Sequence, residues 1–157
     1  MKILHVITRG DEFGGAQSHV RDLAIRQRAD GHEVEVATGA FGALTDALTA
    51  ASVPVIYAPG LLRAIHPVHD ARAVAALRAI ICDRQPQLVS THSSKAGIIG
   101  RAAARLAGTP CLYTVHGWAF NARTPQPMRS LYRGIERGTG LLSARIICVS
   151  DFDRVLG

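Results

Sequence analysis

The sequence lacks any apolar run close to the roughly 20 residues that a membrane-spanning helix needs. It also lacks a signal-peptide pattern, because the N-terminal "MKILHVITRGDE" carries one lysine and a short apolar run that glycine and charge soon interrupt. We therefore expect a cytoplasmic protein. Aromatic residues are scarce at 5%, whereas 48% of the 157 residues are hydrophobic, a profile typical of one α/β domain with a substantial core.

Cysteine is also scarce. Cys82, Cys111 and Cys148 lie far apart, no CxxC pair occurs, and each lies in or beside an apolar segment. We expect buried free thiols rather than a disulfide or a metal site. His66 and His69 flank Pro-Val, but the sequence pairs no third ligand with them, so we expect no bound metal.

Lysine is nearly absent. Lys2 and Lys95 are the only two, and arginine supplies almost all the positive charge behind the net charge of +6. Such a balance suits nucleic acid, an anionic membrane surface or a phosphorylated substrate. The arginines are spread over several expected helices without aromatic residues among them, which argues against nucleic acid.

Three well-known motifs are missing as well. The sequence has no G-x-G-x-x-G, no Walker A motif after a strand, and no G-x-S-x-G elbow. The first turn reads G-D-E-F-G-G instead. This disfavours a dinucleotide-dependent reductase, an alternative that tight binding of NADH would support.

What the sequence does have is a regular alternation of apolar runs with segments of helical period. Strands are expected over 2–8, 33–38, 53–58, 87–92, 110–117 and 145–150. Helices are expected over 17–29, 44–51, from Pro67 to before Pro86, over 93–108, 128–142 and from 151 onward. The order predicts a Rossmann-like α/β fold with a mostly parallel sheet between two helical layers. The long helix from Pro67 is expected to bury Ala71, Val74, Leu77, Ile80 and Ile81.

The residues that follow the expected strands are unusually polar. In an open α/β sheet, ligands bind beyond the carboxyl ends of the strands. Gly14 and Gly15 after the first strand suggest a turn that lets a ligand approach a helix N-terminus, or simply a tight turn. "THSSKAG" offers a serine N-cap, with Lys95 as a possible counter-charge for phosphate. His116 follows a buried strand and suits either a ligand hydroxyl or the backbone.

Five segments in this order resemble one known family. "GGAQSHVRDLA", "GHEVEVATG", "VSTHSSKAGIIGRAAARLAGTP", "YTVHGWAF" and "IICVS" look like the N-terminal domain of family-4 glycosyltransferases, retaining enzymes of the two-domain GT-B fold. The resemblance covers Met1 to Asp151. It implies transfer of a sugar from a nucleotide-sugar to a glycan or a lipid-linked acceptor, without a metal or any other cofactor.

The resemblance also implies roles at matched positions. Gly14 and Gly15 would lie against the donor diphosphate and the transferred sugar, and His116 would bond the donor sugar near the reacting centre. The residues expected to line the acceptor side are His92, Ser93, Ser94 and Lys95.

One departure from the family is large. Its second domain, which carries most of the nucleotide-sugar site, has no counterpart in residues 1–157. We therefore expect a truncated, acceptor-side domain that is inactive alone. The alternative is a non-catalytic subunit or binding module that docks on a separate donor-binding partner. The segment 127–146, with Arg129, Arg133 and Arg137 in one row, leaves peripheral contact with the inner membrane face open.

Overall fold

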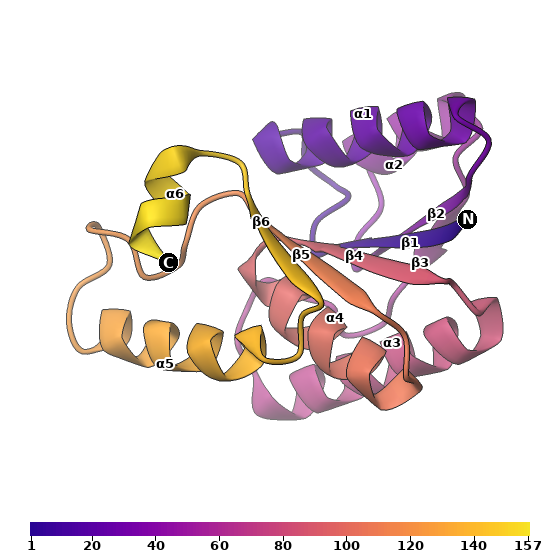
Figure 1. Cartoon of the computed structure of the whole chain (residues 1–157). Helices are drawn as coiled ribbons and strands as arrows, with labels where there is room; N and C mark the ends of the chain where they lie inside the picture. The colour runs from indigo at the N-terminus through magenta and orange to yellow at the C-terminus, as the bar shows by residue number, and fades with distance from the viewer.

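The computed structural model describes all 157 residues, Met1 to Gly157. Six parallel strands form one sheet in the order β3-β2-β1-β4-β5-β6 (Figure 1). The strands are β1 (Lys2–Ile7), β2 (Glu33–Thr38), β3 (Val55–Tyr57), β4 (Leu88–His92), β5 (Cys111–Val115) and β6 (Arg145–Cys148). The chain moves outward from β1 in one direction and then from β4 in the other, so the strand order switches between these two neighbours.

Helices cover both faces of the sheet. α1 (Gly15–Ala29) and α2 (Ala43–Ala50) lie on one face, while α3 (Pro67–Arg84), α4 (Ser94–Ala107) and α5 (Met128–Gly140) lie on the other (Figure 1). A short helix, α6 (Asp151–Leu156), follows β6 at the end of the chain. The predicted three-layer Rossmann-like fold is therefore confirmed.

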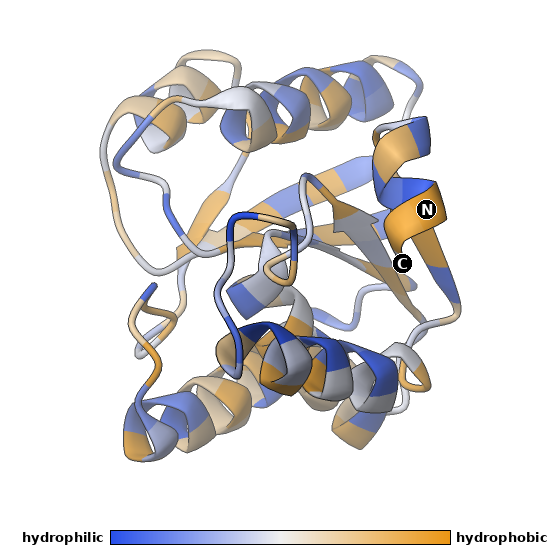
Figure 2. Cartoon of the chain, turned by 90° about the vertical axis from the view of Figure 1, so that its left-hand side faces the viewer, coloured by the Kyte–Doolittle hydropathy of each residue, from blue (hydrophilic) through white to orange (hydrophobic).

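The central strand β1 shows how the core divides. Leu4 and Val6 join a buried cluster with α3 and α4, while Ile3 and Ile7 point the other way into a cluster with α1 and α2. This follows from the two-residue period of a strand. His5 lies on the α1 side with Ile3 and Ile7 and is fully buried. Figure 2 shows the hydrophobic strands lying between helices that carry many hydrophilic residues.

Two sequence predictions need correction. α3 buries Ala73, Leu77 and Ile81, spaced four residues apart, whereas Ala71 is exposed. The other predicted residues do face the core: Leu77 and Ile81 are buried, and Val74 and Ile80 pack against the core. Only the alanine was misassigned, because alanine fits either face of a helix. Cys82 is exposed rather than buried, because it lies one residue past Ile81 and is therefore turned away from the core.

The other thiols agree better with expectation. Cys111 is buried, and burial raises the pKa of its thiol to about 11, while Cys148 is partly buried. Trp118 and Phe120 pack with Tyr113 and Val115 in a small core beneath β5 and α5. None of the helices combines the length and apolar composition that crossing a bilayer requires.

Candidate functional site

A cleft of about 810 Å³ opens where β1, β4 and β5 end, beside the point at which the strand order switches. Its polar lining comes from segments far apart in the sequence, as the strand-end pattern predicted. The polar and charged residues that line it are Thr8, Arg9, Glu12, Gln17, Arg63, Asp70, Ser93, Ser94, Lys95, His116, Tyr132 and Glu136.

The glycine pair begins α1 beside this cleft, but neither glycine is among the residues that line it. Gly14 is the N-cap and Gly15 the first helical residue, and Ala16 and Gln17 beside them line the cleft. Neither glycine has a positive φ, and a Cβ added at Gly15 would meet no atom within 4 Å. Backbone geometry and packing therefore do not require glycine at position 15. Open space in front of a helix N-terminus is what an approaching anionic ligand needs.

The start of α4 forms a second wall. Ser93 is the N-cap, as predicted, but its side chain makes no capping bond and its Oγ lies 2.9 Å from Thr8 Oγ1 instead. Its φ of 76° with ψ of 151° is strained for a residue with a Cβ. Such strain is found at functional sites more often than elsewhere. The uncapped first turn of α4, which begins at Ser94, thus has backbone N–H groups for a ligand.

Lys95 lines the cleft but is not a free cation. Its Nζ lies 2.5 Å from the carboxylate of Asp70, and both side chains are largely buried. A phosphate at this position would have to compete with Asp70 for the ammonium group. Arg63 lines the same cleft from an exposed position on the loop before α3 and supplies positive charge that the sequence gave no reason to single out.

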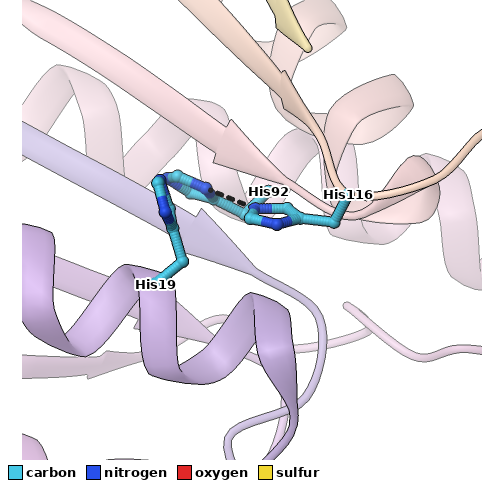
Figure 3. Close-up of side chains that lie close together, drawn as sticks. All are labelled: His19, His92 and His116. Atoms are coloured by element: carbon cyan, nitrogen blue, oxygen red, sulfur yellow. Dashed lines mark hydrogen bonds between the residues drawn. The ribbon is translucent and has the colours of Figure 1, made fainter. Parts of the chain in front are cut away.

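His116 is half-buried and ends a chain of hydrogen bonds that runs into the core. Its Nε2 lies 3.3 Å from His92 Nδ1 (Figure 3). His92 Nε2 lies 3.1 Å from His5 Nδ1 and 3.2 Å from Ser90 Oγ. His5 Nε2 lies 2.8 Å from the Oε1 of Gln27.

These bonds fix which nitrogens carry protons. With the Gln27 amide oxygen accepting from His5 Nε2–H, His5 Nδ1 is an acceptor, so His92 donates through Nε2. His92 Nδ1 then accepts from His116 Nε2–H. Burial lowers the pKa of His5 and of His116 to about 4, and lowers that of His92 well below its usual range. All three imidazoles are therefore neutral at pH 7.

His92 differs from the other predicted acceptor-side residues. Ser93, Ser94 and Lys95 line the cleft, whereas the His92 side chain is fully buried and leaves no atom exposed for an acceptor. The prediction of direct contact between His92 and the acceptor is not met in this structure, because His92 is still the last residue of the buried strand β4 and the lining of the cleft begins at Ser93. His92 instead supports His116 from behind.

Sequence reasoning missed two features of the site. His19 on α1 lies beside His92 and His116, with ring centroids 5.8 and 5.0 Å apart respectively. Arg101 of α4, fully buried, pairs at 2.6 Å with Glu136 of α5, which lines the cleft. The Arg101 Cζ atom lies 4.3 Å from the centroid of the Tyr113 ring. The sequence pattern did not distinguish this buried arginine from the exposed ones.

Comparison with known proteins identifies the family of the chain. A sequence profile of Glycosyltransferase Family 4 matches residues 13–155. An Escherichia coli UDP-Gal:alpha-D-GlcNAc-diphosphoundecaprenol alpha-1,3-galactosyltransferase is 38% identical over 114 residues, which are 72% of this chain and 29% of that protein. The chain belongs to glycosyltransferase family 4.

Solved structures extend the likeness to the fold of this family-4 chain. Anabaena HepE in complex with UDP gives a TM-score of 0.78 at 20% identity, covering 99% of this chain and 39% of HepE. Sucrose-phosphate synthase from Thermosynechococcus elongatus gives 0.73 at 16% identity, covering 98% of this chain and 43% of that protein. The family-4 chain thus spans well under half the length of the relatives it matches.

Proposed function

We propose that this chain is the acceptor-side domain of a retaining glycosyltransferase, which moves a sugar from a nucleotide-sugar donor to a glycan or lipid-linked acceptor. The observation that carries the proposal is the single cleft shared by the start of α1, the start of α4 and His116. The name of the Escherichia coli relative, which describes transfer of galactose from UDP to a sugar on diphosphoundecaprenol, supports a UDP-sugar donor and a lipid diphosphate acceptor.

The donor side of the cleft is assigned to α1 and His116. The N–H groups at the start of α1 would stabilise the leaving diphosphate, and the missing side chain of Gly15 would let it approach. Neutral His116 would bond a hydroxyl of the donor sugar; in the tautomer described, Nδ1 is left free to accept that bond. We propose that the transfer itself needs no metal, because backbone and basic groups take the place of one.

The acceptor side is assigned to Ser93, Ser94 and Lys95, with Arg63 as a further cation toward an acceptor diphosphate. His92 contributes only through His116. Closure of a second, donor-binding domain over the cleft would complete the site and exclude water. The apolar residues that β6 and α6 leave exposed support such a neighbour, among them Ile147, Phe152 and Val155.

Transfer is tested with the complete enzyme, UDP-sugars as donors and a GlcNAc-diphospholipid as acceptor. Gly15→Leu is expected to lower kcat/KM by about 100-fold or more, because the side chain displaces the diphosphate. Stability should hardly change, since nothing lies within 4 Å of the added Cβ. Gly138→Leu is the matched control. A Cβ added at Gly138 also meets no atom within 4 Å, but this glycine lies on α5 and not at the start of α1. Wild-type turnover in Gly15→Leu would refute the donor role.

A second candidate is a non-catalytic module that docks on a separate donor-binding partner, which the exposed apolar face of β6 also favours. The coding sequence after Gly157 separates the two. Continuation into a second α/β domain supports the transferase, and a stop codon supports the module.

Peripheral contact with the inner face of the membrane is part of the proposal, because the acceptor is proposed to be lipid-linked. α5 supports it less than its sequence suggested. Arg129 Nε donates to the Phe120 carbonyl at 3.2 Å and Arg133 lies over the Phe120 ring at 5.4 Å, so only Arg137 of that row is exposed. Co-sedimentation with anionic and neutral vesicles, at low and high salt, tests the contact. Binding that depended neither on the charge of the lipid nor on the salt concentration would refute it.

A further inference from the structure

We propose that His19, His92 and His116 form a binding site for a divalent transition metal such as Zn²⁺, and that an ion bound there blocks the donor side of the cleft. The three side chains come from α1, from the end of β4 and from the loop after β5, and their rings converge (Figure 3). One ring nitrogen from each lies within 4.8 Å of the others. Metal binding rests on these histidines alone, whereas blocking rests on the proposed function.

The spacing fits a tetrahedral ion after a small adjustment. Zn–N bonds of about 2.0–2.1 Å place neighbouring ligand nitrogens about 3.4 Å apart. His92 Nδ1 and His116 Nε2 already lie 3.3 Å apart. His19 must then approach the other two by at most about 1.4 Å, the gap between 4.8 Å and that spacing. Its side chain is exposed on α1 and can therefore change rotamer toward the other two.

The groups behind the cluster hold His92 in the form that a metal needs. His92 Nε2–H donates to His5 Nδ1, and this leaves the lone pair of Nδ1 directed at the cluster. His5 is in turn held by Gln27. Outer partners of this kind fix the tautomer and orientation of ligating histidines in metal sites. On binding, the proton of His116 Nε2 moves to its Nδ1, so that Nε2 becomes a ligand.

The chemistry of the three imidazole ligands and their exposure to solvent decide which ions can bind. Three neutral imidazoles favour Zn²⁺, Ni²⁺ or Cu²⁺ over Mg²⁺ or Ca²⁺, which prefer oxygen. His19 is exposed and His116 is half-buried, so water has access to a remaining coordination position. An ion at this place binds the imidazole that the proposed function assigns to the donor sugar. Occupation should therefore inhibit transfer rather than support it.

Binding is tested by titrating the protein with Co²⁺ and following the visible absorption of a low-symmetry cobalt site, then displacing the cobalt with Zn²⁺. We expect one equivalent to bind, and His19→Ala to weaken binding about tenfold or more. His69→Ala is the matched control, because it removes an exposed histidine of the separate His66–His69 pair and should leave the titration unchanged. Thermal unfolding with EDTA should show that both variants fold.

Absence of the cobalt spectrum, or equal affinity in His19→Ala, would overturn the site whatever the protein's activity. Blocking is tested separately on the complete enzyme, each variant being compared with its own zinc-free rate. Zn²⁺ should inhibit reversibly with EDTA, and His19→Ala should need about ten times more zinc. Zinc that binds without changing the transfer rate would overturn the blocking role while the metal site stands.

Discussion

The central strand β1 and the edge strand β6 differ in how well helices cover their two faces. β1 buries nearly every residue between α1 and α2 on one face and α3 and α4 on the other. β6 has an equally apolar sequence, yet Ile146 and Ile147 remain 42% and 46% exposed. A β-strand sequence therefore does not guarantee burial, which depends on whether helices are present to cover both faces.

The glycines of the helices repeat this contrast. A Cβ at Gly100 of α4 would lie 2.4 Å from the Thr91 methyl group, so close packing against the sheet requires glycine there. A Cβ at Gly134 or Gly138 of α5 would meet nothing within 4 Å. α4 is thus closely packed against the sheet, whereas Gly134 and Gly138 face solvent and Glu136 is the only residue that α5 buries fully.

The largest effect is expected from the contact that ties these two regions together. Glu136→Ala removes the partner of the fully buried Arg101 guanidinium and should lower the free energy of unfolding by about 3–5 kcal/mol. Urea unfolding measures this. Arg137→Ala, the exposed neighbour, should change stability by less than about 0.5 kcal/mol. Equal effects of the two variants would show that α5 does not depend on the buried pair.

The second effect is a loss of stability in acid that originates in the tightly packed region. Folded His5 has a pKa lowered to about 4, so below pH 6.5 the unfolded chain takes up a proton that the folded chain does not. Stability is fully present above about pH 6.5 and falls until about pH 4, by about 3 kcal/mol for His5 alone. His92 and His116 act in the same direction.

Unfolding free energies at a series of pH values test this. His5→Leu should give a flatter curve than the parent between pH 6.5 and 4. Leu141→Ala, which removes an exposed side chain without a titratable group, should leave the shape of the curve unchanged. If the His5→Leu curve were as steep as the parent curve, the acid sensitivity would belong to other groups.

The third effect is overpacking in α4. Gly100→Ala should destabilise the protein by about 1–3 kcal/mol, because the Thr91 side chain and the sheet beneath it must shift. Thermal unfolding measures the change. A neutral result would mean that α4 moves away from β4 without resistance, and that the two regions are equally loosely packed.

The smallest effect has the opposite sign. Gly138→Ala should stabilise the protein by about 0.5–1 kcal/mol, because alanine loses less backbone entropy in a helix and has free space on α5. The same denaturation experiment as for Gly100→Ala compares the two helices directly. Destabilisation at both positions would remove the contrast between them.

The fold was largely predictable because local patterns specify it. The alternation of apolar runs and helical segments predicted all six strands, and Pro67 marked the start of α3 as expected. Gathering of the strand-end residues followed from the rule for parallel sheets, and the cleft contains Ser93, Ser94, Lys95 and His116 together. The large apolar residues of α3 predicted its buried face correctly, but they did not predict which of its alanines is buried, because alanine suits either environment.

The sequence by itself determined the elements, their order, the layers and the edge of the sheet at which a ligand would bind. Only the tertiary structure decided which side chains meet: Lys95 with Asp70, Arg101 with Glu136, and His19 with His92 and His116. The physical reason is that hydrophobic period and strand order act within one element or between neighbours. A contact between distant side chains depends instead on how each helix is rotated and placed over the sheet, and packing of the whole core sets that.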